Sequence, residues 1–277
     1  MDRLEHSTAL DGVIDAVRGT VQSLPLGPLR DGLHGRWLGH PVHPLMVQLP
    51  VGAWLSSAVL DLLPGQRRAS GALIGVGLAT AGPAAVAGWV DWAELKPRQQ
   101  RPGLVHAAAN ITGVALYAAS LAARVRGRAG LGKALGLAGL SAVGVGGAIG
   151  GHLAYRQASG ANHAEAVPDL VEPGWHEIGP VADLPVGAAV RRNVGSLPVV
   201  VVRESGEQVH VLADTCSHQG GPLSEGEVVD GCVRCPWHGS VFRLSDGWNV
   251  QGPATAPQPS FETRITAGRA EVRLREN

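Results

Sequence analysis

Four long apolar runs constrain the fold of this chain more than any other feature. They cover Leu45–Leu63, Ala69–Val90, Leu104–Ala123 and Ala134–Tyr155. Each run approaches or exceeds the ~20 residues that an α-helix needs to cross a bilayer. A soluble helical bundle would carry polar stripes on its outer faces, and these runs carry almost none. The sequence therefore predicts an all-α, four-helix transmembrane bundle over residues 44–156.

The N-terminal segment, residues 1–43, has a different character. It contains acids, bases and prolines, and lacks the apolar core of a secretory signal. Within Thr8–Ser23 the apolar residues fall at helical spacing, with polar residues on the other face, which predicts an amphipathic helix. Such a helix either packs on its own protein or lies on a membrane surface, and the pattern alone leaves both open.

The charged residues argue against a nucleic-acid partner and do not decide the orientation in the membrane. The chain has 23 basic and 23 acidic residues and a formal net charge of zero, so no nucleic-acid partner is expected. Four crossings would return the chain to its starting side, which places the N-terminal segment and everything after Tyr155 together. Lysines and arginines are equally numerous in the loops on both sides, so the positive-inside rule does not fix the orientation.

Several polar side chains are predicted at one end of this bundle. His43, Asp91, His106 and His152 come to the same depth because successive helices run in opposite directions. Polar groups at such positions are costly and tend to mark function. Three interpretations remain open: helix caps that satisfy one another, a metal or haem site that uses two of the three histidines, and a quinone pocket.

The same half of the chain resembles a known family. The resemblance rests on four stretches: "LRDGLHGRWLGHPVHPLMVQLPVGAW" (Leu29–Trp54), "GWVDW" (Gly88–Trp92), "HAAAN" (His106–Asn110) and "GHLAY" (Gly151–Tyr155). They resemble an uncharacterised bacterial family of four-helix membrane domains with a His-Pro-x-His-Pro box. The resemblance covers about residues 25–156. It implies a membrane domain and supplies no activity.

The second half of the chain is predicted to be all-β. Residues 157–173 are small and polar and form a linker. From residue 174 to 277, short β-branched runs alternate with turns, as in "LPVVVVRE" and "EQVHVLAD". A hairpin is expected within Phe261–Glu276, around Ala267-Gly268. The chain is therefore predicted to have two domains, a helical membrane bundle followed by an all-β domain at 174–277.

The β half contains one metal-binding pattern. Cys216-x-His218 is followed, after 16 residues, by Cys235-x-x-His238. Two thiolates and two imidazoles suit tetrahedral zinc, and they also suit a Rieske 2Fe-2S centre. Zinc fingers usually place their histidines on a helix, and no helical periodicity occurs here. Glycines follow each histidine instead, which lets backbone N–H groups approach bridging sulfides.

The residues around this pattern resemble the Rieske domain, and its ferredoxin type in particular. The resemblance rests on "CSHQGGPL", "CPWHGSVF" and "GPATAPQPSFETRI" and covers about residues 174–277. It implies that Cys216 and Cys235 hold one iron and that His218 and His238 hold the other. It also implies that Ser240 faces a sulfur of the cluster.

Departures from the family pattern bear on the reduction potential of the cluster and on the cellular compartment of the domain. Rieske proteins of quinol–cytochrome c complexes have two further cysteines that form a disulfide, and Gly221 and Trp237 stand at those places here. Phe242 replaces a tyrosine that donates a hydrogen bond, so we expect a potential of about −150 mV. Cys232 is interpreted as a buried structural thiol. A free cysteine without a bracing disulfide favours a reducing compartment, hence the cytoplasmic side.

Together these features predict a multi-pass protein of a bacterial cell membrane that transfers single electrons. The expected partners are the lipid bilayer, a soluble donor and a membrane or protein acceptor, with quinone as one candidate. A redox sensor and an accessory subunit of a membrane oxidoreductase are the alternatives. A Rieske oxygenase component is a weaker one, because only about 40 residues follow His238 and a second iron domain is needed. The sequence does not decide whether the protein is an enzyme, and it favours an electron-transfer protein or oxidoreductase subunit over a stand-alone enzyme.

Overall fold

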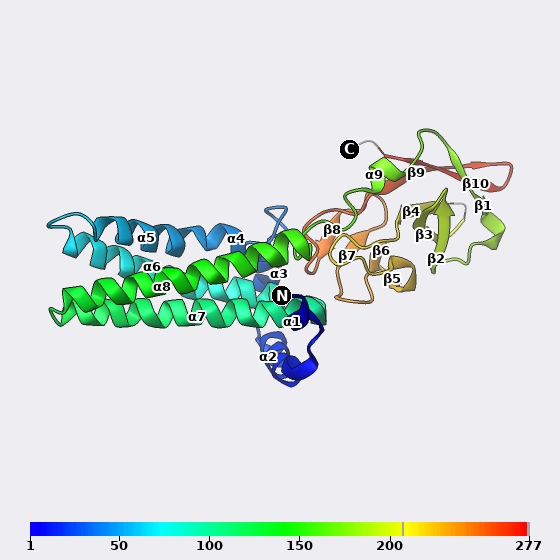
Figure 1. Ribbon diagram of the computed structural model, residues 1–277. Helices are drawn as coiled ribbons and strands as arrows, with labels where there is room; N and C mark the ends of the chain where they lie inside the picture. Colours follow the sequence, from blue (N-terminus) through cyan, green and yellow to red (C-terminus); the bar gives the residue numbers. More distant parts are fainter. Residues whose placement is uncertain (207, 276–277) are drawn as a thin grey trace. The chain divides into compact units, whose positions relative to one another are not determined.

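A computed structural model describes residues 1–206 and 208–275 of the chain (Figure 1). The chain divides into two compact units. One, the helical unit, contains residues 1–26 and 41–159. The other, the β unit, contains residues 27–40 and 160–277, so a short segment before the first apolar run belongs with the C-terminal half.

The helical unit is built from long and short helices. Its helices are α1 (Asp2–His6), a 3-10 turn (Thr8–Leu10), α2 (Asp11–Ser23), α4 (His43–Met46), α5 (Gln48–Leu60), α6 (Arg67–Trp92), α7 (Pro97–Val125), α8 (Ala129–Gly151) and a π-helical turn (His152–Arg156). Among the described residues, three helices are long and apolar enough to cross a membrane: α6, α7 and α8 with its π-helical extension. They match the second, third and fourth predicted runs.

The first predicted run is interrupted. It folds as α4 followed by α5, with a break at Val47, and α5 has 13 residues. Proline explains the break, because Pro50 has no N–H to donate to the carbonyl of Met46 four residues earlier. The all-α character predicted for this half is confirmed, but this element is shorter than the span expected from its sequence.

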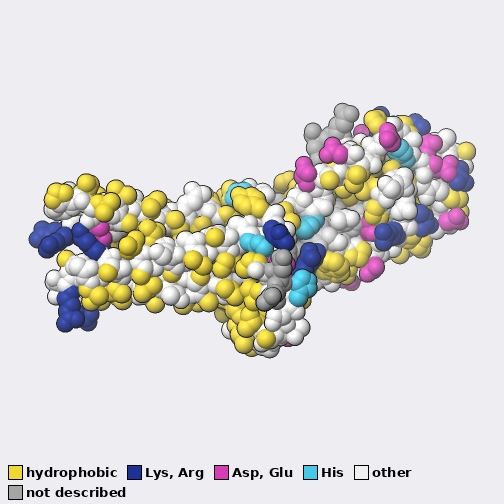
Figure 2. Space-filling model, viewed as in Figure 1, with side chains coloured by type: hydrophobic (Ala, Val, Ile, Leu, Met, Phe, Trp, Pro, Cys, Tyr) yellow, Lys and Arg dark blue, Asp and Glu magenta, His cyan; other side chains and the backbone are white. Residues whose placement is uncertain are grey.

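The helices of the helical unit turn apolar side chains outward (Figure 2). Exposed apolar residues occur along them, including Leu49, Leu55, Val59, Ile111, Leu137 and Val145. The interior is a small cluster around Trp54, Ile74, Tyr117 and Val143. A water-soluble protein rarely exposes apolar surface on this scale, so the pattern suits a helical unit surrounded by lipid.

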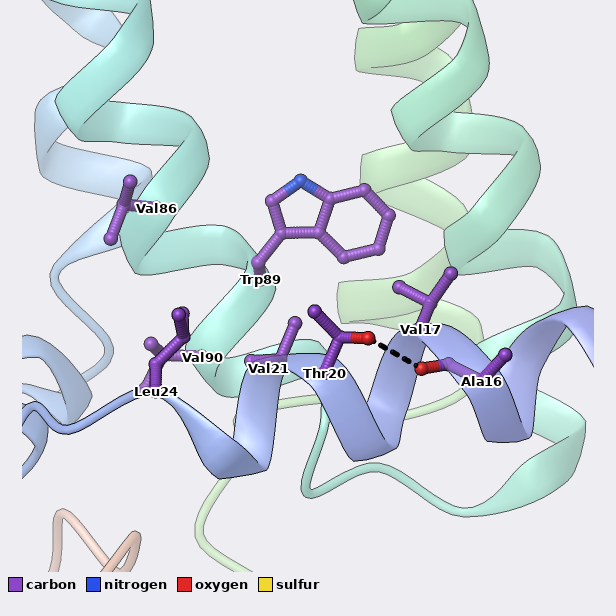
Figure 3. Close-up of a pocket in the computed structure, with 8 residues that line it drawn as sticks. All are labelled: Ala16, Val17, Thr20, Val21, Leu24, Val86, Trp89 and Val90. Atoms are coloured by element: carbon purple, nitrogen blue, oxygen red, sulfur yellow. Dashed lines mark hydrogen bonds between the residues drawn. The ribbon is translucent and has the colours of Figure 1, made fainter.

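The amphipathic helix expected over Thr8–Ser23 corresponds to α2, which begins at Asp11 after a 3-10 turn at Thr8–Leu10. Its side chains Ile14 and Val21 are buried. An apolar groove of about 380 Å³ lies between α2 and α6, and its walls include Val17 and Val21 of α2 and Val86 and Trp89 of α6 (Figure 3). The apolar face of α2 therefore packs on the helical unit, while Val13 remains half exposed.

Within the described residues, the β unit contains two antiparallel sheets and two short α-helices, α3 (Pro28–His34) and α9 (Val167–Leu170). The six-stranded sheet has the order β1-β10-β9-β4-β3-β2, and the four-stranded sheet has the order β5-β6-β7-β8. The strands are β1 (His176–Pro180), β2 (Ala189–Val194), β3 (Leu197–Arg203), β4 (Val209–Ala213), β5 (Glu227–Val229), β6 (Cys232–Arg234), β7 (Val241–Arg243), β8 (Asn249–Gln251), β9 (Ser260–Thr266) and β10 (Arg269–Leu274). The predicted hairpin at Ala267-Gly268 is confirmed, since β9 pairs with β10 around it.

Strand β3 separates two hydrophobic cores. Side chains alternate between the faces of a strand, so Val199 and Val201 enter one core and Val200 and Val202 enter the other. The second core also contains the buried Cys216, Cys235 and Phe242. The two loops that contain the Cys/His pattern are therefore anchored on the back of the large sheet.

Candidate metal centre

Two loops present the Cys/His pattern, and they share one backbone geometry. The first follows β4 and the second joins β6 to β7. In each, the cysteine N–H donates to the carbonyl five residues later, and the cysteine carbonyl accepts from the N–H four residues later; these distances are 2.8 and 2.8 Å for Cys216 and 2.8 and 3.1 Å for Cys235. The residue four positions on is a glycine with φ 76° (Gly220) or 71° (Gly239), where an L side chain is disfavoured.

The two cysteines are buried beside each other. Their exposed fractions are 1% for Cys216 and 3% for Cys235. The adjacent Cys235 thiol and burial raise the pKa of Cys216. The hydrogen bond from the Cys216 thiol lowers the pKa of Cys235 to about 7, and the backbone N–H groups of Trp237 and His238 assist. These contacts favour a thiolate at Cys235, and thiolates are the form that binds metal.

The two imidazoles form a second pair. The ring centroids of His218 and His238 lie 4.9 Å apart, with planes 88° apart. Both residues are half-buried, and the Nδ1 atom of each ring is buried. Within the described part of the chain, no three His, Cys, Asp or Glu side chains gather as a single metal ion would need. The donors form a sulfur pair and a nitrogen pair.

A buried glutamine holds the first loop in place. Gln258 accepts a hydrogen bond from the Ser217 N–H at 3.0 Å through Oε1. Its Nε2 donates to the carbonyls of Ala213 at 2.8 Å and Thr215 at 2.6 Å. Because the side chain is 98% buried, these bonds have no competition from water. The predicted site residue Ser240 is buried at the end of the second loop. Its Oγ accepts a hydrogen bond from the Ala254 N–H at 3.1 Å.

A glycine and a tryptophan meet where the loops approach each other. A Cβ atom on Gly221 would lie 2.9 Å from the ring of Trp237 and 3.0 Å from the Sγ of Cys235. The absence of a side chain at Gly221 is therefore what lets the indole and the thiol come this close. Cys232, predicted to be buried, is only half-buried on β6, and all three cysteines are free.

Comparison with known proteins agrees with this geometry. Residues 174–262 match the Rieske 2Fe-2S domain, and residues 39–163 match the DUF2231 family of predicted membrane proteins. The anthranilate 1,2-dioxygenase ferredoxin subunit of Burkholderia cepacia is 34% identical over 100 residues, which are 36% of this chain and 92% of that protein. The chain belongs to the Rieske 2Fe-2S family. Ferredoxin CarAc of Metapseudomonas resinovorans is 33% identical over 35% of this chain and 92% of its own length.

A solved structure shows the same partial coverage. A chain in the complex of reduced oxygenase and oxidized ferredoxin in carbazole 1,9a-dioxygenase matches with 32% identity and a TM-score of 0.33, over 36% of this chain and 92% of that one. The Rieske match and the membrane-domain match lie in different halves of the chain, as the sequence predicted.

The residues of this Rieske domain fit a 2Fe-2S cluster. They provide two buried sulfurs and two imidazoles with buried Nδ1 atoms, and Gly221 leaves room for Cys235 and Trp237 to approach the first loop. The backbone N–H groups of His218 and Gln219 also point to the Cys216 sulfur. Soft thiolates and neutral imidazoles together are the donor set of a Rieske centre.

The polar residues predicted at the end of the bundle do not all meet. The rings of His43 and His106 are neighbours, with centroids 6.2 Å apart. His152 instead contacts Glu5, with its Nε2 2.8 Å from a Glu5 carboxylate oxygen. Asp91 lies in the last turn of α6 and is half-buried. Of the three histidines predicted for a second site, His43 and His106 therefore lie together, and His152 lies against Glu5.

Proposed function

We propose that the Rieske domain holds a 2Fe-2S cluster through Cys216 and Cys235 on one iron and His218 and His238 on the other. The pairing of sulfur with sulfur and nitrogen with nitrogen carries this assignment. When bound, such a cluster accepts and releases one electron at a time. The chain then acts as a membrane-tethered carrier of single electrons between a soluble donor and a membrane or protein acceptor.

The surface beside the imidazoles supports electron transfer to a docked protein. His218 and His238 are half-buried, so an edge of each ring remains accessible. Trp237 is 49% exposed, and its ring lies 6.4 Å from that of His238. Exposed aromatic residues beside a functional group are typical anchors for a partner protein. The relatives named ferredoxin subunits of dioxygenases support a redox protein as that partner.

Electron paramagnetic resonance of the full-length protein, purified in detergent and reduced with dithionite, tests the ligand assignment. We expect a Rieske signal that is lost in Cys216→Ser and Cys235→Ser. Cys232→Ser is the matched control, because this thiol lies on β6 outside the ligand pairs, and its signal should equal that of the wild type. A wild-type signal that survives in Cys235→Ser would refute the assignment.

A second experiment tests the docking surface. The reduced protein is mixed with cytochrome c, and the second-order rate of electron transfer is measured by stopped flow. Trp237→Ala should lower this rate without changing the cluster signal. Trp175→Ala is the control, because the Trp175 ring is covered by Arg264 and Arg273 elsewhere on the domain. Equal rates for both variants would exclude a role for Trp237 in docking.

The sidedness is part of the same proposal. We propose that both termini and the Rieske domain face the cytoplasm, with an even number of crossings between them. Cys232 is a thiol outside the proposed ligand set and no disulfide braces the ligand loops in the described part of the chain, which supports a reducing compartment. A C-terminal green fluorescent protein fusion should fluoresce, whereas a C-terminal alkaline phosphatase fusion should be inactive. The opposite pair of results would place the domain outside the cytoplasm.

A further inference from the structure

The helical unit contains an internal repeat. Four pairs of residues lie 63 positions apart in the sequence: His43 and His106, Trp54 and Tyr117, Ser57 and Ser120, and Asp61 and Arg124. Three of these pairs meet in space. The histidine rings are neighbours, the Trp54 and Tyr117 rings stack at 4.3 Å, and the Arg124 guanidinium donates to the Asp61 carboxylate at 2.8 Å. Equivalent positions of two repeats therefore face each other.

The helices that follow repeat the pattern with a spacing of 62. The Nδ1 atom of His43 lies 2.8 Å from the carbonyl oxygen of Ala84 on α6. The Nδ1 atom of His106 lies 2.7 Å from the carbonyl oxygen of Gly146 on α8. Four residues beyond each carbonyl is a glycine whose Cβ would press on the same ring: Gly88 at 2.8 Å from His43 and Gly150 at 3.1 Å from His106.

A glycine also lies against each ring of the Trp54 and Tyr117 pair. A Cβ on Gly77 would clash with the Trp54 ring at 2.2 Å, and a Cβ on Gly139 would approach the Tyr117 ring at 3.0 Å. These glycines are again 62 positions apart. The helical unit is thus two helical hairpins, α4–α5–α6 and α7–α8, whose equivalent positions make equivalent contacts, as a pseudo-two-fold axis would require. In membrane proteins, repeats of the same orientation are related by an axis along the membrane normal. The interrupted α4–α5 segment then occupies the place of a full span, like α7.

The histidine pair on this axis has the chemistry of a ligand pair. Each Nδ1 faces a carbonyl oxygen, which can only accept, so Nδ1 carries the proton and Nε2 carries the lone pair. Metal-ligating histidines are typically held in this way, with the second nitrogen donating to a backbone carbonyl. The Asn110 amide lies 3.3 Å from Nε2 of His106 and has a shorter bond, 2.8 Å, to the His106 carbonyl.

A site with only two imidazole ligands from the protein suits few kinds of metal centre. No third His, Cys, Asp or Glu joins them to form a metal-binding group in the described part of the chain. Non-haem sites usually need three or four protein ligands, whereas haem iron takes four nitrogens from its porphyrin. A ring nitrogen about 2.0 Å from a metal puts the ring centroid about 3.2 Å away, so opposed imidazoles would have centroids about 6.4 Å apart. The observed separation is 6.2 Å.

We propose that His43 and His106, one from each hairpin, are the two axial ligands of a haem iron on the pseudo-two-fold axis. Such a haem is a one-electron centre within the membrane domain. Its argument uses only the helical unit, so it does not depend on the ligands proposed for the Rieske cluster. Ionisable or ligating side chains inside a membrane domain are expensive, and a bound metal explains why two of them are placed together.

Optical and paramagnetic resonance spectra of the full-length protein, produced with δ-aminolevulinate and purified in detergent, test the proposal. We expect low-spin ferric haem and one haem per chain by pyridine haemochrome. His43→Gly and His106→Gly should each lose the low-spin signal, and added imidazole should restore it. Restoration by imidazole separates a lost ligand from a misfolded protein.

His152→Gly is the matched control, because this histidine lies at the end of the same helical unit and contacts Glu5. It should keep the wild-type haem content and spin state. The Rieske signal should remain in all three variants, so failure of this proposal is distinguishable from failure of the cluster assignment. A wild-type protein without haem, one that binds copper or zinc instead, or low-spin haem that persists in both axial variants would overturn the proposal.

Discussion

Substitution of Gln258 by leucine tests the claim that this side chain holds the loop of Cys216 and His218. Leucine has a similar volume, so the change removes hydrogen bonds with little change in packing. Three bonds are lost: one from the Ser217 N–H and two to the carbonyls of Ala213 and Thr215. At a net value of about 1 kcal/mol for each bond, the loss is about 3 kcal/mol.

This loss translates into a measurable shift. For a unit of about 100 residues, 1 kcal/mol corresponds to about 4–8 °C, so the Rieske domain of Gln258→Leu should melt roughly 12–24 °C lower. The assay is loss of the visible circular dichroism of the cluster during heating of the full-length protein in detergent. This signal reports the domain that contains the cluster and is insensitive to melting of the helical unit.

A control variant shows whether the effect of Gln258→Leu comes from the ligand loop or from the loss of any buried hydrogen bond. Thr263→Val removes one bond, from Thr263 Oγ1 to the Val209 carbonyl at 2.9 Å, on the large sheet away from the ligand loops. It should lower the melting temperature by about 4–8 °C. If Gln258→Leu melts no lower than Thr263→Val, the role assigned to the glutamine is wrong.

Three further substitutions follow from the packing. Gly221→Ala would put a methyl group 2.9 Å from the Trp237 ring, a clash worth about 1–3 kcal/mol, and should lower the iron content per chain. Phe242→Tyr adds a hydrogen-bond donor in the core behind the cluster loops, and redox titration should show a higher midpoint potential than the expected value of about −150 mV. Asp61→Ala leaves the buried Arg124 guanidinium without its carboxylate and should destabilise the helical unit by about 3–5 kcal/mol in thermal unfolding; Asp61→Arg combined with Arg124→Asp should recover most of it.

Each of these has an outcome that contradicts it. Gly32→Ala is the control for Gly221→Ala, since a Cβ there meets nothing within 4 Å; equal iron content in the two variants would argue against the clash. A potential that is unchanged or lower in Phe242→Tyr would show that the hydroxyl does not reach the cluster. The double variant Asp61→Arg/Arg124→Asp could also prove no more stable than Asp61→Ala. That result would contradict a direct ion pair between positions 61 and 124.

The ligand loops could be predicted because their information is local. Each cysteine, its histidine and the glycine that permits the turn lie within five residues, so a short pattern specifies the geometry. The support of the loop could not be predicted in this way. Gln258 bonds to residues 41 to 45 positions earlier, and nothing near it in the sequence distinguishes it from a surface glutamine. Only the fold of β4 against β9 brings these segments together.

The sequence of the helical unit contains a periodic signal that its hydropathy hides. A spacing of 63 residues relates His43 to His106 and Trp54 to Tyr117, and such a period could be found by comparing the chain with itself. Hydropathy obscures it, because most positions in both hairpins are small or apolar and carry little identity. The contact of His152 with Glu5 was unpredictable, since α1 has no pattern that places it against the end of α8.

Mössbauer spectroscopy of the full-length protein enriched in iron-57, with the haem contribution subtracted, tests the ligand arrangement most directly. Two thiolates on one iron and two imidazoles on the other predict two doublets of equal area with different isomer shifts. On dithionite reduction, the added electron should localise on the iron bound by His218 and His238. A single doublet from two equivalent irons, or a protein with no iron outside haem, would contradict the arrangement.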